Sequence, residues 1–227
     1  MRYPITNTGS KQEVEEFWKI DQSFGQQTAY GFHEGIDWNL KTGGDTDLGQ
    51  ELKSIAPGKI VYYHNSSHPS INFGRHLVVR IEGAWGVRWV HYAHCLNTDF
   101  HGSLQDVTEG QVIARLGKSG TPWAHLHFAI FKADPGSIGG IDSIATNRER
   151  LDAIWEDPVA FIDRWMQTPT SPVTDQSKYD FGEGFGIIEL QQARSIMQAQ
   201  RMDVRRLKLR LTDGATSLRN LASQFES

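Results

Sequence analysis

Short runs of β-branched and aromatic residues, separated by turn-forming segments, occupy the chain from about residue 57 to residue 131. The separating segments are rich in glycine, serine, asparagine, aspartate and proline, as turns and loops are. The runs are KIVYYH (59–64), HLVVRI (76–81), VRWVHYAH (87–94), QVIARL (111–116) and HLHFAI (125–130). This pattern predicts a mainly β fold built on a small antiparallel β-sheet.

The regions on either side of these runs predict the domain organisation. Residues 147–165 carry apolar residues at helical spacing around a start signal, Asp157-Pro158, and should close the domain with helix. A chain of 227 residues has room for one core and an appendage. We therefore expect an N-terminal extension over 1–21, a main domain over 22–165, a linker rich in proline, serine and glycine over 166–188, and an α-helical tail over 189–227.

The expected tail has a heptad pattern of apolar residues that starts at Leu190 and is interrupted at Gln200 and Gly214. Such a pattern is typical of a coiled coil, which would form a homo-oligomer or dock a partner. An amphipathic helix lying on the main domain, or a helical hairpin broken at Asp213-Gly214, would explain the same spacing.

Composition excludes several classes of protein. A net charge of −4 with 22% charged and 38% hydrophobic residues describes an ordinary folded chain with no indication of nucleic-acid binding. One cysteine, Cys95, allows no intramolecular disulfide. No apolar run approaches the ~18 residues of a membrane span, and residues 1–18 lack the apolar stretch of a signal peptide. We expect no membrane insertion, and a leader that was removed or another route of exit.

Two short motifs bring together residue types that bind zinc. GFHEGIDWN (31–39) spaces His33 and Asp37 four apart, and AHLHF (124–128) spaces His125 and His127 two apart. On extended chain, each pair projects to one side, and Gly31 and Gly35 leave room on the first of these sides. Two histidines and one aspartate would satisfy a catalytic zinc site that keeps one position for a water molecule, which the metal activates for amide hydrolysis.

Proton transfer at such a site needs a further residue, and histidine is the commonest choice. His94, at the end of VRWVHYAH, and His125 are the candidates, and alternation places His94 on the same face as Tyr92. A rival interpretation reads 33–37 as a variant of the helical HExxH motif with Glu34 as the base. The glycines at 31, 35, 43 and 44 disfavour a helix there.

At this point the sequence resembles the lysostaphin-like, or LytM-type, zinc metallo-endopeptidases that cut peptidoglycan peptides. The resemblance covers roughly residues 22–165. The matching motifs, in family order, are HEGID (33–37), APGKIV (56–61), FGRHLVVRI (73–81), YAH (92–94), EGQVIARLGKSG (109–120), HLHF (125–128) and EDPVAFI (156–162). Together they are specific, although an HxH or an HxxxD alone would be weak.

The resemblance implies that His33, Asp37 and His127 bind Zn²⁺ and that His94 and His125 are catalytic. It also implies a small antiparallel β fold with the site in a groove walled by loops. Departures from the family are local. Cys95 stands where leucine is common, Ala129 replaces an acidic residue, and the loop 119–124 is shorter and carries Trp123.

Other candidate residues receive plainer interpretations. His64, His68, His76, His91 and His101 have no matching partner spacing and are expected to be surface or satisfied histidines. Cys95, beside His94, is expected to be a small buried hydrophobic residue and not a nucleophile. Trp38 and Trp123 flank motif residues and are expected to bind substrate in the groove.

The sequence thus predicts a zinc endopeptidase that hydrolyses peptide bonds of bacterial peptidoglycan and acts outside the cell or on the cell wall. A phage-associated lysin and a mature bacterial enzyme both fit. The alternative is a non-catalytic module of the same fold that binds the wall or a partner and is displayed by the tail. That alternative predicts lost ligands, whereas all five expected residues are present.

Overall fold

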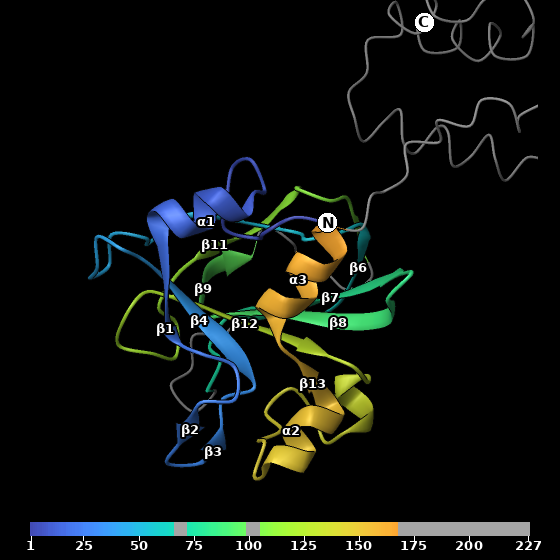
Figure 1. Ribbon diagram of the computed structural model, residues 1–227. Helices are drawn as coiled ribbons and strands as arrows, with labels where there is room; N and C mark the ends of the chain where they lie inside the picture. Colours follow the sequence, from blue (N-terminus) through green and yellow to red (C-terminus); the bar gives the residue numbers. More distant parts are fainter. Residues whose placement is uncertain (66–71, 99–104, 168–227) are drawn as a thin grey trace, which may run out of the picture. The chain divides into compact units, whose positions relative to one another are not determined.

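The computed structural model describes residues 1–65, 72–98 and 105–167 (Figure 1). The predicted linker, from residue 168 onward, and the predicted tail lie outside the described residues. The strands are β1 (Trp18–Gln22), β2 (Gln27–Thr28), β3 (Gly31–Phe32), β4 (Gly35–Leu40), β5 (Glu51–Lys53), β6 (Gly58–His64), β7 (His76–Gly83), β8 (Gly86–Ala93), β9 (Cys95–Thr98), β10 (Gln105–Val107), β11 (Val112–Leu116), β12 (Leu126–Phe131) and β13 (Trp155–Glu156). The helices are α1 (Lys11–Phe17), α2 (Arg148–Ile154) and α3 (Pro158–Gln167), with a 3-10 turn at Pro135–Ser137.

An eight-stranded antiparallel sheet organises the domain. Its strands follow the order β1-β4-β12-β8-β7-β6-β10, and β13 adds to β12. Separate small sheets are formed by β5-β11-β9 and by β2-β3. The predicted mainly β, antiparallel fold is confirmed, and each of the five predicted runs is a strand within two residues of its expected bounds. The segment 97–110, expected to be a loop, also contains the end of β9 and all of β10.

The N-terminal segment, which the sequence placed before the domain, forms part of the domain. Ser10 caps α1 by accepting a hydrogen bond from the Glu13 N–H, and β1 then pairs with β4 along the edge of the large sheet. Tyr3, Ile5 and Trp18 are buried in the main hydrophobic core. This segment therefore covers apolar surface that the rest of the domain would otherwise expose.

The two faces of the large sheet differ in chemistry. One face carries the main core, in which large side chains from β4, β12, β8 and β7 pack with Phe161 and Ile162 of α3. The opposite face carries a smaller apolar cluster around Phe131 and Trp155, and beside it a group of histidines. Strand alternation separates these two sets of residues.

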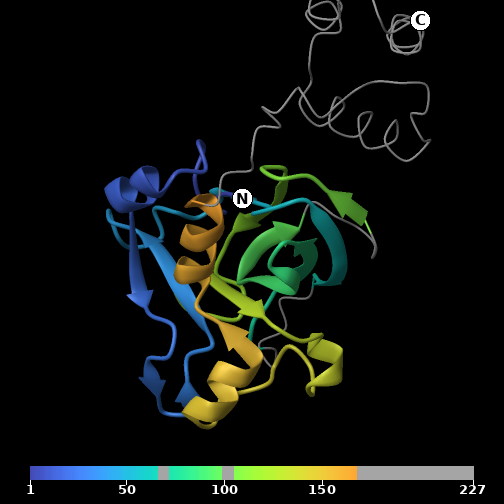
Figure 2. The ribbon, with the colours of Figure 1, turned by 45° about the vertical axis from the view of Figure 1, so that its right-hand side comes forward.

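The C-terminal helices of the domain begin where the sequence predicted helix. Asp157 Oδ1 accepts hydrogen bonds from the N–H groups of Val159 (2.9 Å) and Ala160 (3.1 Å), and Pro158 occupies the first turn of α3. Figure 2 shows α3 lying across the sheet. Within the part of the chain that the structure describes, no helix combines the length and the apolar character that crossing a bilayer requires.

Candidate functional site

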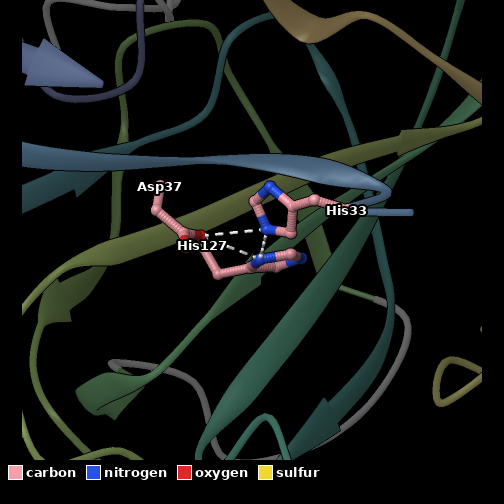
Figure 3. Close-up of side chains that lie close together, drawn as sticks. All are labelled: His33, Asp37 and His127. Carbon is pink, nitrogen blue, oxygen red and sulfur yellow. Dashed lines mark hydrogen bonds and ion pairs between the residues drawn. The ribbon is translucent and has the colours of Figure 1, made fainter. Parts of the chain in front are cut away.

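Three ligand atoms from distant parts of the chain converge on one face of the large sheet (Figure 3). His127 Nδ1 lies 3.0 Å from Asp37 Oδ1 and 3.1 Å from His33 Nε2. His33 Nε2 lies 3.3 Å from the same Asp37 oxygen, which closes the triangle. Among the described residues, this is the only group of three or more potential ligands close enough together to hold a metal ion.

The triangle has the dimensions that a tetrahedral zinc ion requires. Zinc binds imidazole nitrogen and carboxylate oxygen at about 2.0–2.2 Å, so neighbouring ligand atoms around a tetrahedral ion lie about 3.3–3.5 Å apart. The observed separations of 3.0–3.3 Å are slightly shorter and need only small side-chain rotations to reach that spacing. The donor set of two nitrogens and one oxygen leaves a fourth position facing away from the protein ligands.

Strand register creates most of this geometry. Asp37 on β4 is the direct partner of His127 on β12, so both side chains leave the same face of the sheet. Gly35 is needed beside them, because a Cβ there would lie 2.5 Å from the Phe128 carbonyl oxygen and 3.0 Å from His127 Cε1. The absence of a side chain at Gly35 thus makes room for the Phe128 backbone and the His127 ring, whereas the sequence argument expected it to leave room for a metal.

The prediction that strand alternation places His33 on the same side as Asp37 is wrong. His33 lies between β3 and β4, outside either strand, so alternation does not relate it to Asp37. Gly31 has a φ of +146°, and a Cβ on it would lie 2.5 Å from the Ala145 carbonyl oxygen, so this glycine permits close packing of another segment. His33 is held instead by Ser23, whose carbonyl oxygen lies 3.2 Å from His33 Nδ1 and leaves Nε2 to face the site.

Burial and hydrogen bonding compete at these ligands. Burial favours the neutral form of Asp37, but hydrogen bonds from His127 and His33 outweigh it and hold the pKa of the carboxyl far below its usual range. For His33, burial favours the neutral ring, yet the hydrogen bond to Asp37 and its negative charge raise the pKa above the ordinary value. An ionised carboxylate is the form that binds a metal cation.

His94 reaches the site through an unusual backbone conformation. Strand β8 ends at Ala93, and His94 has a φ of +58°, the one positive value among the described residues other than glycine. Such a conformation is costly for a residue with a side chain and is concentrated at functional sites. Tyr92 points into the core and donates to the Lys53 carbonyl, so the predicted shared face of Tyr92 and His94 is wrong. Alternation stops where the strand ends.

His94 and His125 lie side by side next to the metal-binding triangle. Their ring centroids are 4.5 Å apart, and His125 Nε2 lies 3.9 Å from Asp37 Oδ1. His94 Nδ1 lies 2.9 Å from the Ser119 carbonyl oxygen and His125 Nδ1 lies 3.0 Å from the Trp123 carbonyl oxygen. A carbonyl only accepts, so each Nδ1 carries its proton and each neutral ring has its lone pair on Nε2.

Burial keeps these two rings neutral. It lowers the pKa of His94 to about 3, with a smaller contribution from the neighbouring His125, and it also lowers the pKa of His125. A neutral imidazole with a free Nε2 lone pair is a proton acceptor. The arrangement can therefore take a proton from a water molecule placed between these rings and the triangle.

The loop from 117 to 124 is fixed on both sides. The Ser119 hydroxyl donates to the Cys95 carbonyl (2.9 Å) and accepts from the Arg75 N–H (2.7 Å). Asp45 Oδ1 accepts from the Ala124 N–H (2.9 Å). These contacts hold the two carbonyl groups that orient His94 and His125.

Of the two tryptophans predicted to bind substrate, one is buried and the other is exposed. Trp38 is 0% exposed and packs between Tyr3 and Phe128 in the main core, so its predicted contact with substrate is wrong. It follows Asp37 on β4, and alternation sends it to the other face. Trp123 is 67% exposed, and its backbone carbonyl oxygen accepts a hydrogen bond from His125.

The remaining predictions are resolved by burial and backbone conformation. Residues 31–40 contain strands β3 and β4, joined by His33 and Glu34, and no helix, so the HExxH interpretation with Glu34 as base is excluded. Cys95 is fully buried and burial raises the pKa of its thiol to about 12, which agrees with a packing role. His68 and His101 lie outside the described residues.

His76 and His91 differ most from expectation. Both were predicted to be surface or satisfied histidines, but His76 is 3% exposed and His91 is 0% exposed. His91 also lies on the same face as the site, because its register partner on β12 is Ala129, two residues from His127. Both residues have buried ring nitrogens without a hydrogen-bond partner among the described residues. The odd sequence separation of His91 and His94 suggested opposite faces of one strand. That inference is wrong because His94 is outside the strand.

Two histidines and an aspartate, with two further histidines beside them, thus gather at one face of the large sheet. Residues 31–138, which contain all five of these residues, match the family model of peptidase family M23. This match supports the resemblance to the LytM-type peptidases that the motifs indicated. No curated protein matches the sequence.

Several solved structures are similar to parts of the chain. A zinc-containing peptidase from Vibrio cholerae is 24% identical, with a TM-score of 0.43, over 57% of this chain and 35% of that one. The catalytic domain of the antimicrobial peptidase lysostaphin from Staphylococcus simulans is 22% identical, with a TM-score of 0.46, over 68% of this chain and 98% of that one. LytU is 28% identical, with a TM-score of 0.45, over 64% and 84%. These scores lie below 0.5, so the family assignment depends on the family-model match and the motifs.

Proposed function

We propose that this protein is a zinc-dependent endopeptidase that hydrolyses peptide bonds in the stem or cross-bridge peptides of bacterial peptidoglycan. The observation that carries the proposal is the triangle of His33, Asp37 and His127, whose ligand atoms lie 3.0–3.3 Å apart. His94 and His125 beside it supply the bases that hydrolysis needs. The proposal applies the chemistry of the LytM-type family to this chain's own residues.

His33 Nε2, Asp37 Oδ1 and His127 Nδ1 would hold the zinc ion. Bound there, zinc supplies a Lewis acid that polarises a peptide carbonyl and lowers the pKa of a coordinated water to ~7. The buried, ionised Asp37 contributes the negative charge of the ligand set. The register pairing of β4 with β12 holds Asp37 and His127 in place before metal arrives.

His94 and His125 move the protons. Each neutral ring offers Nε2, accepts a proton from the attacking water, and then returns it to the nitrogen of the leaving amine. A ring protonated in this way presents an N–H that stabilises negative charge on the carbonyl oxygen. The carbonyl groups of Ser119 and Trp123 keep both rings oriented throughout.

Substrate contact and location complete the proposal. The exposed Trp123 ring, beside His125, provides a flat apolar surface for an extended peptide or glycan. Peptidoglycan as substrate places the activity at the cell wall, outside the cell, in a phage-associated lysin or a bacterial enzyme. The proposed role of residues 189–227 is self-association or partner docking.

Metal analysis and wall lysis test the function together. Purified protein is dialysed and analysed for zinc, and its lysis of purified cell walls is followed with and without a chelator. One zinc per chain and chelator-sensitive lysis are expected, and His125→Ala should retain zinc but lose lysis. Glu34→Gln is the matched control, because Glu34 lies next to His33 but outside the ligand set. A zinc-free protein, or a His125→Ala variant that lyses walls like the wild type, would refute the proposed enzymatic function.

Mass spectrometry of the digested muropeptides then identifies the bond. New amino termini on glycine would indicate a cross-bridge, and new termini within the stem would indicate a D-amino-acid bond. If the intact protein binds walls tightly and releases no fragment, the chain is a binding module of this fold.

A further inference from the structure

Histidines form a row that leads away from the metal-binding triangle across four neighbouring strands. His127 on β12, His91 on β8, His76 on β7 and His64 on β6 all lie on the same face of the large sheet. Successive ring centroids are 5.9 Å, 5.1 Å and 5.4 Å apart. The family motifs do not include His91, and the proposed mechanism does not use it.

Five ring nitrogens in this row are buried and have no hydrogen-bond partner in the described part of the chain. They are His127 Nε2, both nitrogens of His91, His76 Nε2 and His64 Nε2. A buried polar atom left unpaired costs about 1–3 kcal/mol, so five such atoms in one cluster require an explanation. The cluster is also not a second metal site, because only the triangle brings three ligand atoms together among the residues described.

The two neighbours of His91 in the row determine which nitrogens carry protons. On one side, His127 directs Nδ1 at Asp37 and His33, so as a metal ligand it keeps its proton on Nε2. On the other side, His76 Nδ1 lies 2.9 Å from the Gly74 carbonyl oxygen, so Nδ1 donates and Nε2 holds a lone pair. Between a donor on His127 and an acceptor on His76 stands one neutral ring, His91, with one acceptor and one donor.

We propose that His91 is a positioning residue for the metal ligand His127: it accepts a hydrogen bond from His127 Nε2–H and donates one to His76 Nε2. This inference rests on the proposed zinc site. It satisfies four of the five unpaired nitrogens with two hydrogen bonds and ends on the Gly74 carbonyl, and it leaves His64 Nε2, whose ring stacks on His76, outside these bonds. Metal-binding histidines nearly always donate their second N–H to such a partner, which fixes the ring and increases its basicity.

Ring spacing supports both bonds. Two imidazoles joined by an N–H···N bond have centroids about 5 Å apart, because each nitrogen is about 1.1 Å from its centroid and the bond is about 2.9 Å. His76 and His91, at 5.1 Å and an interplanar angle of 89°, are at that spacing. His91 and His127, at 5.9 Å, lie within an ångström of it, a gap that a small ring rotation closes.

Burial keeps the rings of His76 and His91 neutral, because it lowers the pKa of both. Burial lowers the pKa of His76 to about 4, and its ring stacks on Tyr62 and His64. Phe73 packs edge-on against His91, with centroids 4.8 Å apart, and lies 5.0 Å from His127. Neutral rings each have one donor and one acceptor, which is what a directed row requires.

Zinc affinity of three variants tests the positioning role. The apo protein is titrated with zinc against a chromophoric chelator, using wild type, His91→Leu, His91→Gln and Phe73→Leu. We expect His91→Leu to weaken zinc binding about 10–100-fold. The glutamine side chain carries a donor and an acceptor, so His91→Gln should bind zinc more tightly than His91→Leu. Phe73→Leu, which perturbs the same packing without removing a hydrogen bond, should stay within about threefold of wild type.

Imidazole tautomers in the wild type test the same row without any variant. Nitrogen-15 NMR of histidine-labelled, zinc-loaded protein should assign the proton of His127 to Nε2, that of His76 to Nδ1, and a single proton to His91. Equal zinc affinity of wild type and His91→Leu, or a different tautomer at His76 or His127, would overturn the inference. A wild type that binds no zinc would refute the proposed function instead. The tautomers of His76 and His91 would then test only the proposed hydrogen bond between these two residues.

Discussion

Asp37 and His127 face each other across two antiparallel strands, with Asp37 Oδ1 3.0 Å from His127 Nδ1, although they are 90 residues apart in the chain. The strand register alone brings these two ligand atoms to metal-binding distance. Gly35, two register pairs away, keeps the strands and the His127 ring close. The backbone pairing of β4 with β12 therefore fixes the relative positions of these two side chains.

Removal of the metal should lower thermal stability. A ligand that binds only the folded state stabilises it by about 2.7 kcal/mol at 100 times its dissociation constant. We expect chelation to lower the Tm of the wild type by several degrees and added zinc to restore it. Asp37→Asn, which removes the anionic ligand, should show no zinc-dependent shift in a thermal melt. A zinc-dependent shift of normal size in this variant would place the ion elsewhere.

Substitution of the two neutral histidines should separate catalysis from metal binding. His94→Ala and His125→Ala remove a proton acceptor but no ligand, so kcat should fall about 10²–10⁴-fold while zinc content stays near one per chain. Activity on purified walls and metal analysis of the same preparations provide the measurement. Loss of zinc from both variants would contradict the assignment of roles.

The two tryptophans provide a matched pair of substitutions. Trp38 is fully buried against Tyr3 and Phe128, so Trp38→Ala should cost about 3–5 kcal/mol of unfolding free energy. Trp123→Ala should change stability by less than about 0.5 kcal/mol and should raise KM several-fold if the ring contacts substrate. Urea unfolding and wall-lysis kinetics distinguish the two effects, and an unchanged KM for Trp123→Ala would remove Trp123 from the substrate site.

A buried carboxyl outside the site should make stability depend on pH. Asp47 is 0% exposed, and burial, aided by the charge of Asp45, outweighs the backbone hydrogen bonds from Asp47 and Leu40 and raises its pKa to about 6. Because this folded-state pKa exceeds the unfolded value of ~3.9, ionisation destabilises the fold as pH rises through 6, and the effect disappears below about pH 4.

Asp47→Asn should therefore stabilise the protein by about 1–3 kcal/mol at pH 8 and change little at pH 4. Denaturant unfolding of both proteins at the two pH values measures this difference. Asp152→Asn serves as the control, since Asp152 is exposed and paired with Arg148. An Asp47→Asn variant that is less stable than wild type at pH 8 would show that the carboxylate has a stabilising partner.

Local sequence predicted the strands well because alternation and turn residues act over a few positions. The five runs between 59 and 130 became strands, and Asp157-Pro158 did begin a helix. The same reasoning missed β1 and β10, which are short edge strands with weak alternation. Their pairing depends on a neighbouring strand that local sequence does not specify.

At the candidate site, reasoning from strand alternation predicted only part of the arrangement. Motif resemblance identified His33, Asp37, His94, His125 and His127, and the structure brings these residues together. Parity arguments failed at His94, where the strand stops, and at His33, which lies between strands. Parity applied to β4 would have excluded Trp38 from the site, since it is adjacent to Asp37.

The sequence by itself determined which residues share a strand face, because side chains alternate with period two along extended chain. It could not determine which face is covered by the core, or which residues stand opposite each other on neighbouring strands. Those choices belong to the tertiary structure, where burial of Trp38 and Phe128 assigns one face to the core. The opposite face then receives Asp37, His127 and the buried His91, because register pairs strands that are distant in sequence.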